Sequence, residues 1–205
     1  MSFFFLFLSL PKIGPREGCF DDIVFDTESE AAFESAFINR KLVDIERRGK
    51  YLLFRLSGKG PHIVIHYGMT GTLLVKDAPM PVYKSFDVNK ANIWPPMYTK
   101  YELIFDNGTR VAYIDPRRLG RVKLRFTDAL LQPPLSLLGH DPLNDSPRVE
   151  PSAFVAALKG YSCPIKALLL NQNSIFCGLV SCARFFTLFC NSFHNANYPI
   201  CWCFL

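Results

Sequence analysis

Residues 51–71 of the chain read YLLFRLSGKGPHIVIHYGMTG and indicate two β-strands joined by a tight turn. Tyr51–Leu56 and His62–Tyr67 are short runs dominated by apolar, aromatic and β-branched residues, which favour extended backbone. Between them, residues 57–60 (SGKG) have the composition of a turn. Residues 68–71 (GMTG) carry a glycine at each end and break the second strand. The stretch therefore predicts two strands followed by a glycine-flanked loop.

Four further strands are predicted downstream on the same grounds. The segment from Arg121 to Phe126 alternates charged and apolar side chains, as a strand with one solvated face does. Residues 106–108 (DNG) form a hairpin signal between two others. The four strands are Thr72–Val75, Tyr101–Phe105, Arg110–Ile114 and Arg121–Phe126. Six short strands with tight turns predict a β-sandwich or a barrel.

One helix is predicted before these strands, over residues 26–39 (DTESEAAFESAFIN). Helical spacing places Phe33 and Phe37 on one face, and acidic side chains lie near the positive end of the helix dipole. Thr27 is the predicted N-cap, because its hydroxyl group can accept a hydrogen bond from a backbone amide of the first turn.

The chain changes character after the strands. Residues 131–148 are rich in proline and polar side chains and predict a linker. A helix is predicted to open at Pro151 and to close at Gly160, and a second helix to start at Pro164. From Asn173 on, the sequence has one charged residue, five cysteines and eight aromatic residues, without a helical or strand period. This composition indicates sequence that did not evolve as the end of this domain, with a buried apolar helix as the alternative.

Basic residues are concentrated in one block of the chain. Residues 40–126 hold 17 basic and 7 acidic side chains, whereas residues 1–39 hold 2 and 7, and residues 127–205 hold 4 and 4. A basic block in an otherwise neutral or acidic chain favours a polyanion as partner. A solvated, lysine- and arginine-rich surface is an equally good explanation of the charge alone.

Cysteine usage and the apolar start bear on compartment and metal binding. The seven cysteines include no CxxC pairs at zinc-finger spacing, and nothing in the basic block indicates disulfides, so the sequence predicts no metal and a reducing compartment. Residues 1–10 (MSFFFLFLSL) are too short an apolar run to span a bilayer. They lack the basic start and the cleavage site of a signal peptide, so secretion is disfavoured.

Three segments carry candidate chemistry. Residues 47–53 (RRGKYLL) place three cations at the head of a strand, from which they could reach phosphates. The loop at residues 68–71 carries Met69, an unbranched apolar side chain that suits insertion between DNA bases. Residues 115–120 (DPRRLG) are a proline-fixed turn that presents two guanidinium groups and the apolar Leu119.

Each segment alone has an ordinary structural explanation. Cations at a strand end are usually surface charge, a histidine such as His66 is more often a core residue, and a PRR turn is common. Their occurrence together and in this order favours DNA as the partner. An arginine beside an apolar wedge can bond the base that is left behind when its partner nucleotide is flipped out.

With the sequence around them, these segments resemble the formamidopyrimidine-DNA glycosylase (Fpg/Nei) family, and fungal and plant members in particular. The resemblance runs from Asp21 to Gln172 and rests on KYLLFRL, IVIHYGMTGTL, ELIFDNGTRVAYIDPRRLGRV, LGHDPL and PIKALLLNQ. It implies an α+β fold. We expect an Fpg-type N-terminal β-sandwich flanked by a helix, followed by the start of a helical, helix-two-turn-helix domain.

The resemblance also implies roles for individual residues. Members of the family flip an oxidised base out of duplex DNA, cut the glycosidic bond with an N-terminal proline amine and form a Schiff base at the sugar. Lys50 would be the catalytic lysine that contacts a phosphate near the lesion and assists elimination. The DNA-binding residues would be His66, Met69, Arg117, Arg118, Leu119 and Lys166. Of these, Met69, Arg117 and Leu119 would fill the void, and the other three would contact the DNA backbone. Lys100 stands near a position where other members carry histidine.

Two regions depart from the family pattern. The proline–glutamate start of the family has no counterpart at the beginning of this sequence. The glycine-rich turn, the rest of the helix-two-turn-helix and the zinc or zincless finger have none after Gln172. We therefore expect no bound cofactor and impaired chemistry. The expected domains are an unmatched apolar start (1–18), the catalytic β-sandwich (19–126), a linker (127–149) and a truncated helical DNA-binding domain with an atypical tail (150–205).

The function predicted from the sequence is DNA repair. The chain would be a DNA glycosylase/AP lyase for oxidised purines in base-excision repair, impaired as it stands, and its partner would be damaged double-stranded DNA. We expect a monomer, a nuclear location and no membrane association. One alternative is a non-catalytic remnant that binds damaged DNA, and a second is an exported β-sandwich protein of unrelated function.

Overall fold

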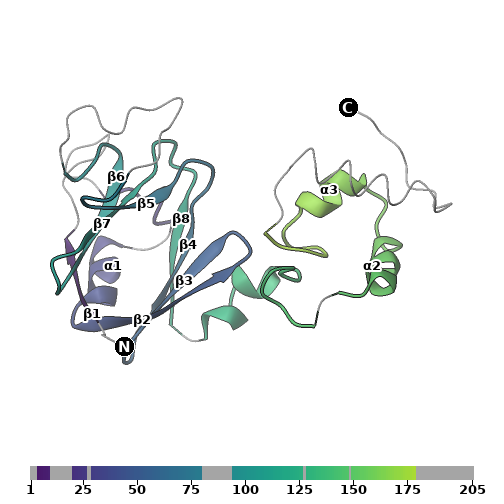
Figure 1. Cartoon of the computed structure of the whole chain (residues 1–205), viewed down its shortest axis with the longest axis horizontal. Coiled ribbons are helices and arrows are strands. Elements are labelled where there is room, and N and C mark those ends of the chain that lie inside the picture. The colour runs from purple at the N-terminus through teal and green to yellow at the C-terminus, as the bar shows by residue number, and fades with distance from the viewer. Residues whose placement is uncertain are drawn as a thin grey trace. The chain divides into compact units, whose positions relative to one another are not determined.

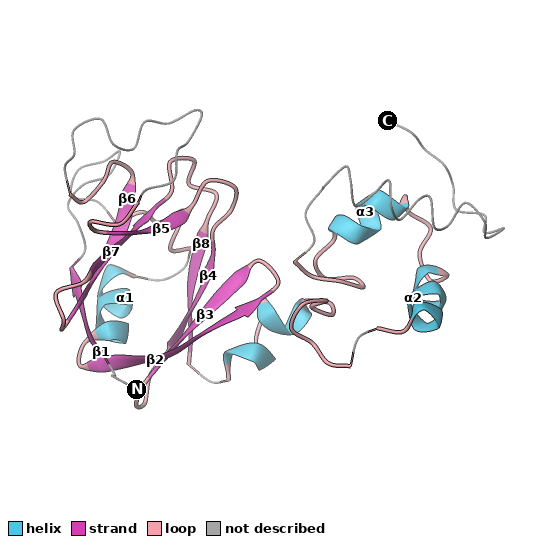
Figure 2. Ribbon diagram, in the orientation of Figure 1, coloured by secondary structure: helices cyan, strands magenta, loops and turns pink. Residues whose placement is uncertain are grey.

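The computed structural model describes residues 4–9 (backbone only), 20–26, 29–79, 94–126, 128–147 and 149–178. The chain divides into two compact units (Figure 1). The first comprises Met1–Arg47 and Tyr51–Leu131, and the second comprises Arg48–Lys50 and Gln132–Leu205. Figure 2 shows that the strands lie in the first unit, whereas the second combines short helices with loops.

The described residues of the first unit form an eight-stranded sheet with the strand order β5-β7-β6-β1-β2-β3-β4-β8. Neighbouring strands pair antiparallel, for example β3 with β4 and β6 with β7. The strands are β1 (Phe4–Ser9), β2 (Arg40–Arg48), β3 (Tyr51–Leu56), β4 (His62–His66), β5 (Thr72–Val75), β6 (Thr99–Phe105), β7 (Arg110–Ile114) and β8 (Arg121–Arg125). Short antiparallel strands with tight turns were the pattern predicted from residues 51–126.

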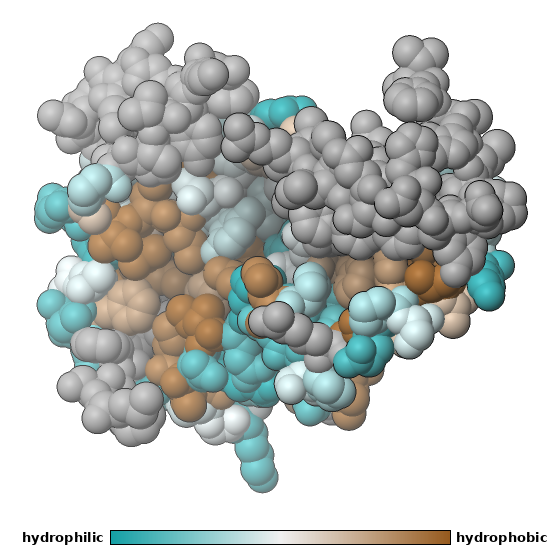
Figure 3. Space-filling view, turned by 45° about the vertical axis from the view of Figure 1, so that its right-hand side comes forward, coloured by the Kyte–Doolittle hydropathy of each residue, from teal (hydrophilic) through white to brown (hydrophobic). Residues whose placement is uncertain are grey.

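The sheet folds over a hydrophobic core. Ile63 of β4 and Val122 of β8 belong to the same buried cluster as Tyr101 of β6 and Tyr113 of β7, although these strand pairs lie in opposite halves of the strand order. The two halves of the sheet must therefore curve toward each other, which gives the predicted α+β sandwich. Figure 3 shows that apolar side chains also reach the surface in places, as is normal for a folded protein.

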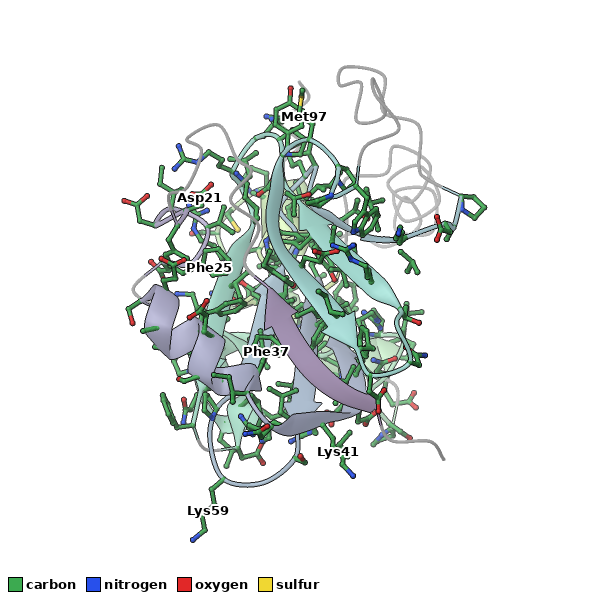
Figure 4. The ribbon with its side chains drawn as sticks, turned by 90° about the vertical axis from the view of Figure 1, so that its left-hand side faces the viewer. Asp21, Phe25, Phe37, Lys41, Lys59 and Met97 are labelled. Atoms are coloured by element: carbon green, nitrogen blue, oxygen red, sulfur yellow. The ribbon has the colours of Figure 1, made fainter. Side chains whose placement is uncertain are left out.

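Helix α1 (Glu30–Phe37) covers this core. Phe33 and Phe37 are buried, as the helical spacing predicted, and Figure 4 shows Phe37 between the helix and the sheet while Lys59 projects from the β3–β4 turn. The N-cap is Ser29 rather than the predicted Thr27, which lies outside the described residues. The Ser29 hydroxyl accepts a hydrogen bond from the amide of Ala32 at 3.1 Å.

Strand β1 was not predicted, because residues 1–18 were interpreted as an unmatched apolar start. The structure places Phe4–Ser9 between β2 and β6, with Leu6 opposite Arg40 on one side and opposite Phe105 on the other. Such a strand and the apolar region of a signal peptide share one composition, so the sequence pattern does not separate them.

The described part of the second unit contains a 3₁₀ turn, η2 (Leu135–Leu137), and two helices, α2 (Pro151–Leu158) and α3 (Ile165–Leu170). A further 3₁₀ turn, η1 (Ala129–Leu131), ends the first unit. Both helices begin where the prolines predicted, with Pro151 at the first helical position and Pro164 as the N-cap. Phe154 of α2 packs on Phe176, with the ring centroids 5.4 Å apart.

The region predicted to be a linker is partly packed in the second unit. The Gly139 amide donates to the Gln172 carbonyl at 2.9 Å, and the His140 amide donates to the Ile175 carbonyl at 3.0 Å. The Cys177 amide donates to the His140 carbonyl at 2.9 Å, so His140 and Phe176 form an isolated parallel β-bridge. Residues 173–178, at the start of the tail that was interpreted as foreign sequence, are therefore packed in this unit. The rest of that tail lies outside the described residues.

Within the described part of the chain, no helix is both long and apolar enough to cross a membrane.

Candidate nucleic-acid interface

Two loops of the first unit carry Met69, Arg117 and Leu119, the three residues predicted to fill a void in DNA. These three are called the wedge residues. The methionine loop, residues 67–71, connects β4 to β5. The Gly71 amide donates to the Tyr67 carbonyl at 2.9 Å and closes the loop, while Gly68 adopts a φ of +62°, a conformation that favours glycine. Met69 lies at the tip, and 78 % of its surface is exposed. A large apolar side chain held out in this way contributes little to the core.

The arginine turn, residues 115–120, connects β7 to β8. The Arg118 amide donates to the Asp115 carbonyl at 3.3 Å. The Arg121 guanidinium then caps the turn, because Nη1 donates to the carbonyls of Arg118 (3.2 Å) and Gly120 (2.6 Å). The turn presents Arg117 and Leu119 to solvent, with Leu119 exposed over 41 % of its surface.

The methionine loop and the arginine turn are in direct contact. The buried Asp115 carboxylate accepts a hydrogen bond from the Gly120 amide at 2.7 Å and another from the Thr70 hydroxyl at 3.1 Å. Gly68 lies against Leu119 so closely that a Cβ atom at Gly68 would stand 2.7 Å from the Leu119 carbonyl carbon. Met69 and Leu119 therefore emerge from adjoining backbone segments.

Arg117 differs from its neighbour in the arginine turn. Its side chain is exposed, and it makes no hydrogen bond or ion pair with any residue that the structure describes. The fork of a guanidinium group is suited to bidentate contacts with base edges or phosphates. The structure thus brings together the three residues predicted to fill a void in DNA, on two loops clamped to each other.

Arg118 is bound to Asp21, which the sequence analysis did not single out. The Arg118 guanidinium contacts the Asp21 carboxylate through Nε at 3.0 Å and Nη2 at 2.9 Å. The Lys100 ammonium group donates to the same carboxylate at 2.6 Å, and only 2 % of its side chain is exposed. Lys100 is therefore a buried ion-pair partner. The contact with the DNA backbone that the resemblance implies for Arg118 would have to be made while its Nε and Nη2 atoms bind Asp21.

This pairing determines the charge state of Asp21. Burial would raise the pKa of the carboxyl group, but hydrogen bonds from Arg118 and Lys100, with their positive charges, outweigh it and lower the pKa below its ordinary value. Asp21 is thus ionised at neutral pH. The Asp21–Lys100–Arg118 cluster carries one net positive charge.

His66 ends β4 immediately before the methionine loop. Its Nδ1 accepts a hydrogen bond from the Gly68 amide at 3.1 Å, so the proton of the neutral ring is on Nε2. The ring lies 4.8 Å from that of Tyr51. His66 thus holds the base of the loop that carries Met69, in addition to any contact with DNA.

Lys50 lies in the turn between β2 and β3, which belongs to the second unit. The Gly49 amide donates to Asp141 at 2.8 Å, and the Arg48 guanidinium contacts Asp145 at 2.6 Å. Asp145 in turn accepts from the Asp141 amide at 2.8 Å. Asp141 of the LGHDPL motif and Asp145, two residues after it, thus hold the RRGK turn, and neither was predicted to have this role.

Burial also affects Lys50 itself, since partial burial lowers the pKa of its ammonium group. A lysine with a lowered pKa is deprotonated more often near neutral pH and is a better base or nucleophile. Lys166, the other lysine implied by the resemblance, lies in α3, but its side chain is outside the described structure. Among the described residues, no group of three or more His, Cys, Asp or Glu side chains could hold a metal ion.

The Lys50 turn requires glycine at position 49, and this requirement can be tested. Gly49 has a φ of +57°, and a Cβ atom there would lie 3.0 Å from Cys177 Sγ. Gly49→Ala is expected to destabilise the second unit by about 1–2 kcal/mol from the left-handed backbone alone. Gly160→Ala is the matched control in the same unit, because its Cβ would meet nothing closer than 3.6 Å. Amide hydrogen exchange of residues 139–145 is the measurement, and equal protection in both variants would contradict the prediction.

Comparison with known proteins identifies the family. The family model described as the formamidopyrimidine-DNA glycosylase N-terminal domain matches residues 19–122. The chain belongs to the formamidopyrimidine-DNA glycosylase family. The match includes the methionine loop and the arginine turn, and it covers Lys50 as well.

Curated relatives with this name occur in a plant and in bacteria. The formamidopyrimidine-DNA glycosylase of Arabidopsis thaliana is 28 % identical over 155 residues, which are 76 % of this chain and 39 % of the relative. That of Symbiobacterium thermophilum is 37 % identical over 158 residues, or 75 % and 45 %. The chain therefore spans less than half the length of these relatives.

Solved structures of the family share the fold. The Lactococcus lactis enzyme bound non-covalently to DNA with an AP site has a TM-score of 0.59 at 21 % identity, covering 85 % of this chain and 56 % of that one. MutM in complex with DNA containing carbocyclic 8-oxo-G has a TM-score of 0.57 at 20 % identity, covering 87 % and 56 %. These similarities support the α+β fold that was predicted.

Proposed function

We propose that this chain recognises damaged double-stranded DNA at a nucleotide that has left the helix. The observation that carries the proposal is the pair of clamped loops that hold Met69, Arg117 and Leu119 at the surface of the first unit. An exposed apolar pair beside a guanidinium group matches what a vacated base stack offers, namely a hydrophobic gap and an unpaired base edge. The family relatives bound to AP-site and 8-oxo-G DNA support this class of ligand.

Within this proposal, the wedge residues have distinct tasks. Met69 and Leu119 occupy the gap, and the Arg117 fork bonds the base that has lost its partner. His66, Arg118 and Lys166 contact the DNA backbone. For Arg118, the Asp21 carboxylate fixes the guanidinium plane, so a phosphate has to approach the atoms that Asp21 leaves uncovered.

The proposed chemistry is that of a DNA glycosylase/AP lyase acting on oxidised purines in base-excision repair. Lys50 is the residue of this chain that we assign to it. Its amine, with a pKa lowered by burial, would contact the phosphate next to the lesion and assist elimination at the sugar. The buried carboxylate of Asp141 holds the Gly49 amide and so fixes the backbone that precedes Lys50.

A duplex carrying 8-oxoguanine tests the chemistry of the whole chain. Strand cleavage together with an adduct that is stable after borohydride reduction would show glycosylase and lyase activity. Binding without either product would favour the second candidate, a non-catalytic protein that recognises damaged DNA. That candidate is supported by the wedge, since its three residues and their clamp lie in one unit and require no nucleophile.

Salt dependence tests whether phosphates lead the binding. If at least two cations of the basic block contact phosphates, the affinity for duplex DNA is expected to fall about tenfold between 50 and 200 mM salt. A fluorescence-anisotropy titration of a labelled duplex at both salt concentrations measures this. An affinity that does not change with salt would contradict phosphate-led binding.

A further inference from the structure

We infer that Asp115 is a positioning residue that couples the methionine loop to the arginine turn, so that the wedge enters DNA as one rigid body. The inference rests on the proposed recognition of damaged DNA and extends it to a residue that does not touch the DNA. Asp115 is fully buried, so its carboxylate serves neither solubility nor a direct contact with phosphate.

The carboxylate divides its two oxygens between the two loops. Oδ1 accepts the hydrogen bond from the Thr70 hydroxyl at 3.1 Å, next to Met69, and Oδ2 accepts that from the Gly120 amide at 2.7 Å, next to Leu119. One side chain therefore sets the spacing between the two apolar tips.

The surroundings leave this arrangement little freedom. Gly71 and Gly120 both lie against the Tyr113 hydroxyl, where a Cβ atom would stand 2.8 Å and 1.9 Å away, respectively. The Tyr113 ring is itself buried and packs on Tyr67 and Tyr101, with centroids 5.7 Å and 5.2 Å apart. Both loops therefore pack against the Tyr113 hydroxyl, and Asp115 links them to each other through its two hydrogen bonds.

Rigidity of this kind has a specific consequence for recognition. A wedge that is already ordered loses less conformational entropy when it enters the base stack. The gain applies only to DNA with a vacated position, since intact duplex leaves no gap for the wedge. Loss of the coupling should therefore lower the preference for abasic over intact duplex, and it should affect intact-duplex binding much less.

Thr70→Val tests this inference, because it is nearly isosteric and removes the hydroxyl that donates a hydrogen bond to Asp115. We expect the ratio of abasic to intact affinity to fall about fivefold or more. Thr70→Ser keeps the hydroxyl and should restore the ratio, and Thr72→Val, two residues away in β5, should leave it unchanged. Affinities are measured on the full chain with matched duplexes, and 2-aminopurine opposite the abasic site reports on insertion of the wedge.

The outcomes separate the inference from the function on which it rests. If the unaltered chain prefers abasic DNA and Thr70→Val retains that preference, coupling by Asp115 is overturned while the proposed function stands. An equal loss on both duplexes also overturns it, because a merely structural role would produce that result. If the unaltered chain shows no preference, both the function and the inference are overturned. Asp115→Ala, which removes both hydrogen bonds, is expected to lower the ratio further, and a ratio above that of Thr70→Val would contradict the inference.

Discussion

Replacement of Asp21 by alanine is expected to destabilise the β-sheet unit by about 3–5 kcal/mol, the usual loss when one partner of a buried ion pair is removed. The reason is the position of Lys100. Its ammonium group is 2.6 Å from the Asp21 carboxylate, and 2 % of its side chain is exposed, so the variant leaves a buried charge without a counter-ion. Arg118, which is 30 % exposed, can turn to water and loses less.

Amide hydrogen exchange of β6 is a suitable measurement, because it reports on the first unit separately from the second. Asp22→Ala is the matched control. Its carboxylate is 83 % exposed and lies 3.7 Å from Arg118, so its removal should change the free energy of unfolding by less than about 1 kcal/mol. If Asp21→Ala and Asp22→Ala reduced the free energy of unfolding by similar amounts, the Asp21–Lys100 ion pair would contribute no more than a surface ion pair, which would contradict the prediction.

The same ion pair has a pH signature. The folded-state pKa of Asp21 is lower than that of the unfolded chain, so its contribution to stability is present above the ordinary carboxyl pKa of 3.8. The contribution is lost as the pH falls through the lower folded-state value. The difference in stability between the unaltered chain and Asp21→Ala should therefore be constant near neutral pH and shrink in strong acid.

Local patterns predicted much of the sheet. The bounds of β3, β5 and β7 agree with the prediction, because a turn that contains glycine lies next to at least one end of each of these strands. Strand β2 was missed for a physical reason. Its residues Val43 and Ile45 are exposed, so the apolar positions of this strand do not coincide with the face that packs on the core. The bounds of a strand are predictable where burial and local sequence agree.

The residues of the candidate site also divide into those that local sequence predicted and those that it did not. Met69, Arg117 and Leu119 lie in short contiguous motifs, and their exposure follows from loops that glycine and proline fix locally. The partners that hold the site are distant in sequence. Asp21 is 97 residues from Arg118, and Gly49 is 92 residues from Asp141. A carboxylate whose partner is this far away along the sequence cannot be distinguished from other acidic residues before the fold is known.

Replacement of Arg117 by alanine is expected to reduce the preference for abasic over intact duplex by about 5- to 100-fold, the value of one good bidentate base contact. The side chain is exposed and has no partner among the described residues, so its removal should not disturb the fold. On intact duplex every base is paired, and the guanidinium has only phosphates to contact. The loss on that substrate should therefore be small.

Two further variants separate the fork from the charge. Arg117→Lys keeps the positive charge but not the planar pair of donors, so it should restore affinity for intact duplex without restoring the preference for abasic DNA. Lys59→Ala removes an exposed charge from the β3–β4 turn and should leave the preference unchanged. If Arg117→Ala weakened both duplexes equally and Arg117→Lys restored both, Arg117 would be an ordinary phosphate contact. The wedge would then consist of Met69 and Leu119 alone, and the base opposite the gap would have to be held by another group.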